Sequence, residues 1–255
     1  MRKYKGGIFF DIDGTLINLE NGIDKPTEKT LEAIKKLQDE GYLIGIATGR
    51  MHNYIPDSIL DLNLEVYISS NGAVSKYNGE NIVNDIINPD LLEESLDFLD
   101  ENGCRYVVAC DDVSYFNGEK NERFPWINKN VFPLDNKRKN ASKVTTSYTE
   151  EFLCKFKDKY KDRLYVLLHR QNMDFGDITV SKASGIKKTA EYFGIDFDNI
   201  YTFGDDYNDF EMISEFKHGV AMTPHVKELE EVADYITDSV ENEGIYKAFE
   251  HYGLI

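Results

Sequence analysis

Short runs of hydrophobic residues alternate along the chain with segments whose hydrophobic positions recur at helical spacing. Near the start, Ile8–Phe10, Leu43–Ala47 and Val66–Ile68 are uninterrupted apolar runs of strand length. The segment 27–40 between the first two runs has its apolar residues on one helical face and ends at Gly41. Continuous apolar strands separated by amphipathic helices are typical of a parallel sheet that helices cover on both faces. The pattern predicts an α/β fold with a Rossmann-like, doubly wound parallel-sheet core.

The same alternation returns towards the other end of the chain. Helices are predicted at about 184–192, 209–216 and 226–232, and each precedes a short apolar strand, at 200–203, 219–222 and 235–236. The stretch between the two halves is less regular and richer in aromatic and amide residues. We therefore predict one core domain formed by residues 1–81 and 179–255, with residues 82–178 inserted as an α+β cap domain.

Within the inserted stretch the pattern predicts helices at 89–102 and 149–160 and strands at 105–109, 165–169 and 177–180. Four aromatic residues there are expected in the small domain's own core, with a substrate-facing role as the alternative: Phe116, Phe124, Trp126 and Phe132. The basic run 137–139 is interpreted as a solvated loop, with a route for anions as the alternative.

Composition narrows the class of partner. The 255 residues include 29 Lys and Arg against 46 Asp and Glu, a net charge of −17. Such an acidic chain lacks the basic footprint that binding to nucleic acid or to an anionic membrane requires. No apolar stretch approaches the ~18 residues of a membrane span. With Cys104, Cys110 and Cys154 interpreted as reduced structural thiols, we expect a cytoplasmic protein without an obligate protein partner.

Candidate chemistry begins directly after the first strand, in the sequence Asp11-Ile12-Asp13-Gly14-Thr15-Leu16. Two carboxylates at this position project from the carboxyl end of the sheet, where open α/β sheets bind ligands. Gly14 permits the tight turn that brings backbone amides towards an anion. The alternative is an Asp-rich turn, but the whole motif behind a buried strand is more specific than that.

Polar groups also follow the next strands. Thr48 and Gly49 can bind a phosphate oxygen, and Asn71 stands in the polar stretch after the third strand. Each of these is equally compatible with a plain turn. Lys182, just before a predicted helix, could neutralise phosphate charge, although taken singly it resembles a solvated surface lysine.

The most acidic cluster is Gly204-Asp205-Asp206-Tyr207-Asn208-Asp209, which follows the strand at 200–203. Such carboxylates repel one another unless a cation or protons compensate them. Hard oxygen ligands favour Mg²⁺ completed by water and substrate phosphate. Because each polar cluster follows a separate apolar strand, a parallel sheet would gather all of them along one edge. A solvated-surface explanation does not account for that placement.

On these motifs, together with Ala47-Thr48-Gly49-Arg50, Ser70-Asn71-Gly72-Ala73 and Ser181-Lys182, the sequence resembles the haloacid dehalogenase superfamily. The resemblance is to its Cof-type phosphatases with a large α/β cap (class IIB), and it covers the core nearly end to end. It implies a phosphoric monoester hydrolase that acts on small-molecule phosphate esters.

The resemblance also implies roles for single residues. Asp11 would be the nucleophile, and Asp13 the acid and then the base. Mg²⁺ would bind Asp11, the backbone carbonyl of Asp13, and Asp205, with Asp209 in support. Phosphate oxygens would be held by the Ile12 backbone amide, Thr48, Gly49, Lys182 and Asn208. Arg50 and Asn71 are candidates for the edge that faces substrate.

One stretch departs from the family pattern. After Ala221-Met222 the family usually continues Gly-Asn-Ala, whereas this chain has Thr223-Pro224-His225. Thr223 as N-cap with Pro224 in the first turn is sound helix-start chemistry, so we expect a helix to begin there. His225 is expected to be solvated in that turn.

The leading hypothesis is a Mg²⁺-dependent phosphatase of small phosphorylated metabolites, sugar phosphates foremost, working through an aspartyl phosphate. One alternative is a specialised sugar-phosphate phosphatase or a phosphomutase that differs in the cap. Another is a non-catalytic relative that binds phosphorylated metabolites. The intact Asp11, Asp13, Lys182 and Asp205 count against that last alternative.

Overall fold

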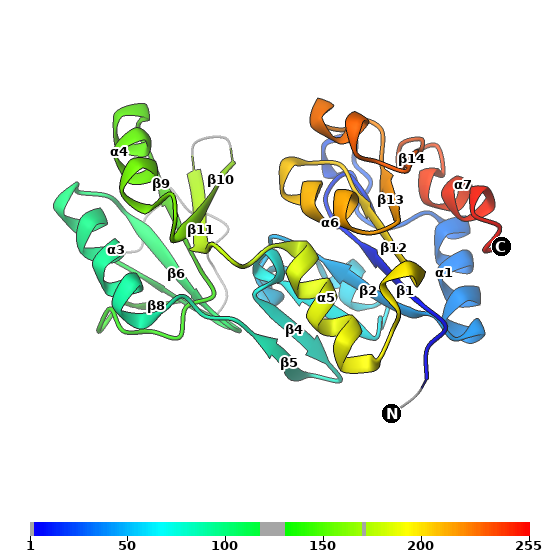
Figure 1. The fold of residues 1–255 in the computed structure, drawn as a ribbon, viewed down its shortest axis with the longest axis horizontal. Helices are drawn as coiled ribbons and strands as arrows, with labels where there is room; N and C mark the ends of the chain where they lie inside the picture. Colours follow the sequence, from blue (N-terminus) through cyan, green and yellow to red (C-terminus); the bar gives the residue numbers. More distant parts are fainter. Residues whose placement is uncertain (1–2, 118–130, 170–171) are drawn as a thin grey trace. The chain divides into compact units, whose positions relative to one another are not determined.

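The computed structural model describes residues 3–117, 131–169 and 172–255. Its contacts divide the chain into two compact units, here called the core unit and the cap unit (Figure 1). The core unit contains residues 1–50, 55–83 and 181–255, and the cap unit contains 51–54 and 84–180. The sequence-based boundaries were placed after residues 81 and 178, two residues before each of these divisions. The segment 51–54, which the sequence assigned to the core, packs with the cap unit.

The core unit is built on an eight-stranded sheet. In spatial order its strands are β14 (Tyr235–Ile236), β13 (His218–Ala221), β12 (Ile200–Gly204), β1 (Gly7–Phe10), β2 (Leu43–Ala47), β3 (Val66–Ser69), β4 (Val74–Tyr77) and β5 (Glu80–Asn84). The first six run parallel, which confirms the predicted α/β core. β4 turns back antiparallel to β3, an edge that the sequence pattern did not predict.

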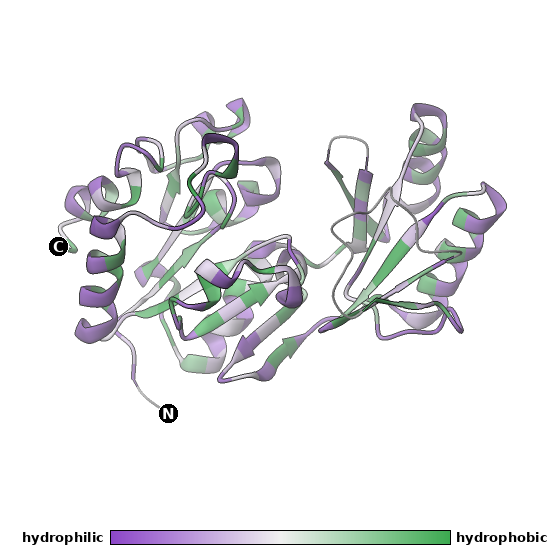
Figure 2. Ribbon diagram, turned by 180° about the vertical axis from the view of Figure 1, so that it is seen from behind, coloured by the Kyte–Doolittle hydropathy of each residue, from purple (hydrophilic) through white to green (hydrophobic). Residues whose placement is uncertain are grey.

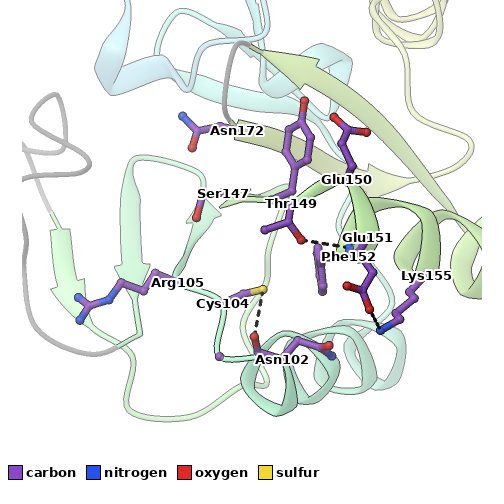
Figure 3. Close-up of a pocket in the computed structure, with 12 residues that line it drawn as sticks. Asn102, Cys104, Arg105, Ser147, Thr149, Glu150, Glu151, Phe152, Lys155 and Asn172 are labelled. Carbon is purple, nitrogen blue, oxygen red and sulfur yellow. Dashed lines mark hydrogen bonds and ion pairs between the residues drawn. The ribbon is translucent and has the colours of Figure 1, made fainter.

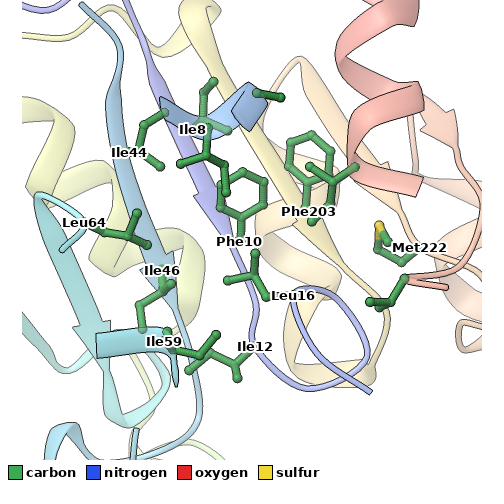
Figure 4. Packing of buried hydrophobic residues seen from close by; sticks show 14 of the residues in the cluster. Ile8, Phe10, Ile12, Leu16, Ile44, Ile46, Ile59, Leu64, Phe203 and Met222 are labelled. Carbon is green, nitrogen blue, oxygen red and sulfur yellow. The ribbon is translucent and has the colours of Figure 1, made fainter. Parts of the chain in front are cut away.

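Helices cover both faces of this sheet. They are α1 (Glu28–Glu40), α2 (Asp57–Leu60), α5 (Lys182–Phe193), α6 (Phe210–Glu215) and α7 (Gly244–His251), with 3-10 turns η1 (Leu19–Asn21), η3 (Ser70–Gly72), η4 (Phe197–Asn199), η5 (Tyr207–Asp209) and η6 (Lys227–Glu231). Ile8 and Phe10 of β1 pack into the hydrophobic cluster shared with α1 and α7 (Figure 4). Phe9 points to the other face and packs into the cluster shared with α5 and α6. The strand is therefore buried on both faces, which explains its unbroken apolar run.

Capping residues set the ends of the longer helices. Thr27 accepts a hydrogen bond from the backbone of Thr30 at the start of α1, and Gly41 ends that helix in a left-handed conformation. Hydrophobic and polar residues alternate around the helices, whereas the central strands of the sheet are mainly hydrophobic (Figure 2). Among the described residues, no helix combines the length and apolar character needed to cross a bilayer.

The cap unit is an α+β layer of its own. Its sheet has the spatial order β10 (Leu164–His169), β11 (Asn172–Asp177), β9 (Lys143–Ser147), β6 (Tyr106–Cys110), β7 (Val113–Phe116) and β8 (Val131–Pro133). The helices α3 (Pro89–Glu101) and α4 (Glu150–Tyr160) pack on one face of it through a shared hydrophobic cluster. The unit also includes the 3-10 turn η2 (His52–Tyr54).

Several expectations for the cap stretch are wrong. The strand predicted at 177–180 is a turn after β11, because Thr179 donates to the Asp177 side chain and Val180 to the Asp177 carbonyl. Phe132 is 49% exposed and so is not a core residue. Phe124 and Trp126 lie outside the described residues. The basic run 137–139 does lie in a loop with Arg138 exposed, as expected.

Ion pairs with α3 hold this basic loop in place. Lys137 pairs with Asp97 and Asp100, and Arg138 with Asp90 and Glu93, all four on α3. Solvent screens such exposed pairs, so they serve to place the segment before β9 rather than to stabilise the unit strongly.

The stretch 223–225 also differs from expectation. No helix begins at Thr223; its hydroxyl donates to the Thr237 carbonyl, the Thr223–Pro224 peptide is cis, and η6 begins only at Lys227. His225 is largely buried, with its Nδ1 atom 2.9 Å from the Met222 carbonyl. The backbone N–H of Val226 donates to the Asp205 carbonyl, so this stretch packs beside the acidic cluster.

Candidate active site

The first element of the site is the turn that follows β1. Asp11 leaves the strand with its backbone N–H bonded to Phe203 of β12, and the chain then closes a tight turn in which Gly14 has a φ of +89°. A side chain at Gly14 would place its Cβ 2.2 Å from a carboxylate oxygen of Asp205. Glycine is required here both for the left-handed backbone and for the close approach of Asp205.

Three carboxylates converge at this edge of the sheet. One oxygen from each of Asp11, Asp205 and Asp209 lies within 4.8 Å of the others. Asp11 follows β1 and the other two follow β12, the neighbouring parallel strand. Thr15 steadies the group by donating its hydroxyl to Asp205 over 3.1 Å.

Lys182 lies among these carboxylates. It opens α5 directly after the N-cap Ser181, and only 1% of it is exposed. Its ammonium donates to Asp11 over 2.7 Å and to Asp209 over 2.6 Å. The interpretation of Lys182 as a solvated surface lysine is therefore wrong.

Asp209 is a supporting residue by its contacts. One of its oxygens binds Lys182, while the other accepts the backbone N–H groups of Asp205 and Asp206 over 2.9 and 3.0 Å. Both oxygens are thus engaged within the protein. The carboxylate holds the loop that carries Asp205 in place.

The charges of the cluster do not balance. Lys182 brings one positive charge against three carboxylates. Burial, and then the neighbouring carboxylates, raise the pKa values of Asp11 and Asp205 above the usual range despite the ammonium of Lys182. Burial alone would lower the pKa of Lys182, but Asp11 and Asp209 raise it, so the lysine stays charged. The site is short of two positive charges.

A divalent cation fits that deficit. Carboxylate oxygens from two loops, with room for water and substrate oxygens, are the ligands that Mg²⁺ prefers. Burial first, and then repulsion between neighbouring carboxylates, raise the pKa values of Asp11 and Asp205, and a cation would relieve both effects.

Asp13 lies apart from this cluster. Its side chain is 48% exposed, and its two oxygens accept hydrogen bonds from Nε and an Nη of Arg50, each 2.7 Å long. Such a two-pronged contact fixes the plane of the carboxylate as well as its position. The sequence placed Arg50 among candidates for contact with substrate and did not predict that it would hold Asp13.

A third group gathers Thr48, Gly49, Asn71 and Asn208. Thr48 is buried at the end of β2 and accepts the backbone N–H of Asn71 on its carbonyl. The side-chain amide of Asn208 donates to that of Asn71 over 3.2 Å, beside Gly49. Ile12 follows Asp11 in the first turn, with its side chain buried in the core. The candidate site residues thus form three adjoining groups in the core unit.

The sequence analysis missed Thr15. It belongs to the first motif, is fully buried, and orients Asp205 from 190 residues away in the chain. A hydroxyl directly after Asp-Gly was the available signal, because such a side chain usually satisfies a nearby turn or carboxylate.

A separate hollow of about 780 Å³ lies in the cap unit (Figure 3). It is bounded by the end of α3 near Asn102 and Cys104, by Arg105 and Asn172, and by the start of α4. Thr149 caps α4 here, and Glu151 pairs with Lys155. None of the candidate site residues lines it.

Comparison with known proteins identifies the family. A family model described as haloacid dehalogenase-like hydrolase matches residues 8–249. The chain belongs to the haloacid dehalogenase-like hydrolases. The resemblance inferred from the motifs is thereby confirmed.

Individual relatives of this hydrolase match along nearly its whole length. YkrA of Bacillus subtilis (strain 168) is 29% identical over 257 residues, covering 97% of this chain and 98% of its own. The 5-amino-6-(5-phospho-D-ribitylamino)uracil phosphatase YcsE of the same organism is 27% identical, covering 97% and 95%. The solved subclass IIB sugar phosphatase BT4131 has a TM-score of 0.86 at 26% identity and covers 98% and 100%. Family and relatives together identify the chain as an enzyme, a phosphoric monoester hydrolase.

Proposed function

We propose that this hydrolase is a Mg²⁺-dependent phosphatase that removes the phosphoryl group from small phosphorylated metabolites through an aspartyl phosphate on Asp11. The observation that carries the proposal is the uneven buried cluster, in which three carboxylates surround a single lysine. A bound Mg²⁺ would supply the missing positive charge and stabilise charge on the transferring phosphoryl group. Asp11, Asp205 and the backbone carbonyl of Asp13 would hold it.

The chain's own residues divide the reaction into two displacements. In the first, an oxygen of Asp11 forms a bond to phosphorus, the bond to the leaving oxygen breaks, and protonated Asp13 gives that oxygen its proton. In the second, Asp13 as carboxylate takes a proton from water, whose oxygen attacks phosphorus and releases Asp11 and inorganic phosphate. Splitting one hard step into two easier ones is the advantage of a covalent intermediate. General acid–base help of this kind contributes ~10²–10⁴ in rate.

Other groups would bind and orient the phosphoryl oxygens. Lys182 already contacts Asp11, so an oxygen transferred to Asp11 meets its ammonium. Thr48, Gly49, Asn208 and the Ile12 amide are assigned to the remaining oxygens. Arg50 fixes the carboxylate of Asp13 in the plane that the proton transfers need.

The substrates of two relatives narrow the class. YcsE carries a phosphoribitylamino compound in its name, and BT4131 is a sugar phosphatase. Both descriptions share a phosphate on a polyhydroxylated carbon chain. We propose the same class here, with sugar phosphates foremost, and we assign substrate selection to the cap unit.

The test measures hydrolysis of p-nitrophenyl phosphate by the full chain with Mg²⁺ and with EDTA. We expect EDTA to abolish turnover, added Mg²⁺ to restore it, and Asp11→Asn to lower kcat by at least ~10⁴. Asp39→Asn is the matched control, because Asp39 is an exposed aspartate whose carboxylate pairs with Lys35 on the same helix. Metal-independent turnover, or an active Asp11→Asn enzyme, would contradict the proposal.

A panel of phosphorylated metabolites then separates the remaining alternatives. Release of inorganic phosphate from sugar phosphates or the phosphoribitylamino compound supports the proposal. An isomerised sugar phosphate would indicate a mutase, and binding without turnover a non-catalytic protein.

A further inference from the structure

The turn that follows β3 has an unusual backbone. Ser70, Asn71 and Gly72 have φ values of +53°, +57° and +104°, so three residues in succession lie in the left-handed region. For a residue other than glycine this region costs ~1–3 kcal/mol, and it persists only where the surroundings enforce it. Ser70 and Asn71 are also almost fully buried. Strain of this kind is concentrated at functional sites.

The turn is bonded to the loop that carries Thr48 and Gly49. The backbone N–H of Asn71 donates to the Thr48 carbonyl over 3.0 Å, and that of Ser70 donates to the Arg50 carbonyl over 2.8 Å. These bonds flank Gly49 on both sides. The position of the Asn71 side chain is therefore fixed relative to the proposed phosphate loop.

The Asn71 side chain meets Asn208 beside Gly49. The Nδ2 atom of Asn208 donates to Oδ1 of Asn71 over 3.2 Å. A Cβ at Gly49 would lie 2.8 Å from Oδ1 of Asn71 and 3.2 Å from Nδ2 of Asn208, so any larger residue would disturb both amides. Among the residues the structure describes, Nδ2 of Asn71 is buried without a hydrogen-bond partner, an arrangement that stability alone does not favour.

The backbone and the side chain of Asn208 are held by different residues. Asn208 lies in η5, where Asp206 and Asp209 cap each other reciprocally and fix the backbone. That capping does not include the Asn208 carboxamide, which instead donates to the side chain of Asn71. A carboxamide presents N–H donors on one side and a carbonyl acceptor on the other, and only the N–H side binds a phosphoryl oxygen.

We infer that Asn71 is a positioning residue, which accepts one N–H of Asn208 and so presents the other N–H of that amide to the phosphoryl group. The inference rests on the proposed function. It assigns Asn71 a role through Asn208 instead of a direct contact with substrate. Three features keep the Asn71 and Asn208 amides in contact. They are the strained turn, its two backbone hydrogen bonds and the absence of a side chain at Gly49.

A double-mutant cycle of Asn71 and Asn208 tests whether Asn71 acts through Asn208. We expect Asn71→Gly and Asn208→Ala each to lower kcat/KM for p-nitrophenyl phosphate by about 10- to 100-fold, the size of a hydrogen bond to a charged group. Because Asn71 acts through Asn208, the double variant is expected to lose no more than Asn208→Ala alone. Losses that multiply, or an Asn71→Gly enzyme equal to the parent, would overturn the inference. An inactive parent would instead contradict the proposed function.

Folding is controlled separately. Glycine adopts the left-handed region without strain, and Asn78→Gly makes the same change at an exposed asparagine with a φ of +52°. Asn71→Ser is the second variant should Asn71→Gly unfold, because Ser70 already adopts this conformation in the same turn.

A binding readout completes the test. The inhibition constant of inorganic phosphate is expected to rise in Asn71→Gly and Asn208→Ala by similar factors, without further increase in the double variant. The thermal midpoints are expected to match that of Asn78→Gly. An unchanged inhibition constant with a lowered midpoint would assign Asn71 a purely structural role and overturn the inference.

Discussion

Lys182 in the core unit and Lys143 in the cap unit are both buried against aspartates, and their surroundings differ in charge. Lys182 in the core unit faces Asp11 and Asp209, with Asp205 close by. Lys143 in the cap unit pairs with Asp174, whose other oxygen accepts the hydroxyl of Thr145 over 2.6 Å. In the first cluster three carboxylates surround one ammonium, whereas in the second the single carboxylate of Asp174 faces Lys143 and lies 3.7 Å from His169.

The titration of the aspartates follows this difference. In the core cluster, burial and mutual repulsion raise the pKa values of Asp11 and Asp205. In the cap pair, burial opposes ionisation of Asp174, but Lys143, His169 and Thr145 outweigh it and lower the pKa. A buried carboxylate whose charge is met by neighbouring groups is a structural feature, whereas a cluster with surplus carboxylates has unmet charge that a cation or substrate can complete.

The largest effect is expected from removing each lysine in turn. Lys182→Met should lower kcat/KM by about 10²–10³, because it removes a preorganised positive group beside the reacting oxygens. Lys143→Met should leave kcat for p-nitrophenyl phosphate close to that of the parent when assayed below its unfolding temperature. Equal losses of kcat in the two variants would remove the functional distinction between the clusters.

For stability, unlike activity, the larger loss is expected from the variant in the cap unit. Asp174→Asn removes the buried carboxylate that pairs with Lys143, and breaking a buried pair typically costs ~3–5 kcal/mol. Asp205→Asn removes one of the surplus carboxylates, so in EDTA we expect it to unfold no more easily than the parent. Urea unfolding followed by circular dichroism measures both. A strongly destabilised Asp205→Asn variant would show that its carboxylate is already balanced without metal.

The core site was largely predictable because a simple rule places it. Parallel strands end at one edge, so polar residues after separate apolar strands must meet there, and Asp11, Thr48 and Asp205 do. Helix ends such as Thr27 and Gly41 follow from local capping chemistry. These features depend on neighbours in sequence or on the parallel arrangement alone.

What escaped prediction depends on partners far apart in the chain. In the sequence alone, Lys182 resembles a surface lysine. In the fold its ammonium donates a hydrogen bond to Asp11, 171 positions away. Arg50 donates hydrogen bonds to Asp13, and Asn208 donates one to Asn71. No local sequence pattern encodes these side-chain contacts. The strand expected at 177–180 failed for the converse reason, since the Asp177 side chain satisfies Thr179 locally and favours a turn.

The dependence of stability on pH in EDTA separates the two clusters by sign. The folded pKa of Asp11 is raised above the ordinary 3.8, so the folded state holds this proton more tightly and the corresponding stability is lost as pH rises. The folded pKa of Asp174 is lowered from 3.8, so its contribution is present above that value and lost as pH falls.

Variants at Asp11 and Asp174 make these opposite dependences of stability on pH measurable. Relative to the parent, Asp11→Asn should gain stability as pH rises from ~4 to ~7, by up to ~1.4 kcal/mol per pH unit for one proton. Asp174→Asn should be most destabilised near neutral pH and approach the parent only as pH falls below ~4. Urea titrations at several pH values supply the free energies of unfolding, and added Mg²⁺ should flatten only the Asp11 difference, because metal competes with that proton. Parallel pH profiles for the two variants would mean that the two buried lysines sit in equivalent electrostatic surroundings, and the argument for a cation site in the core unit would lose its physical basis.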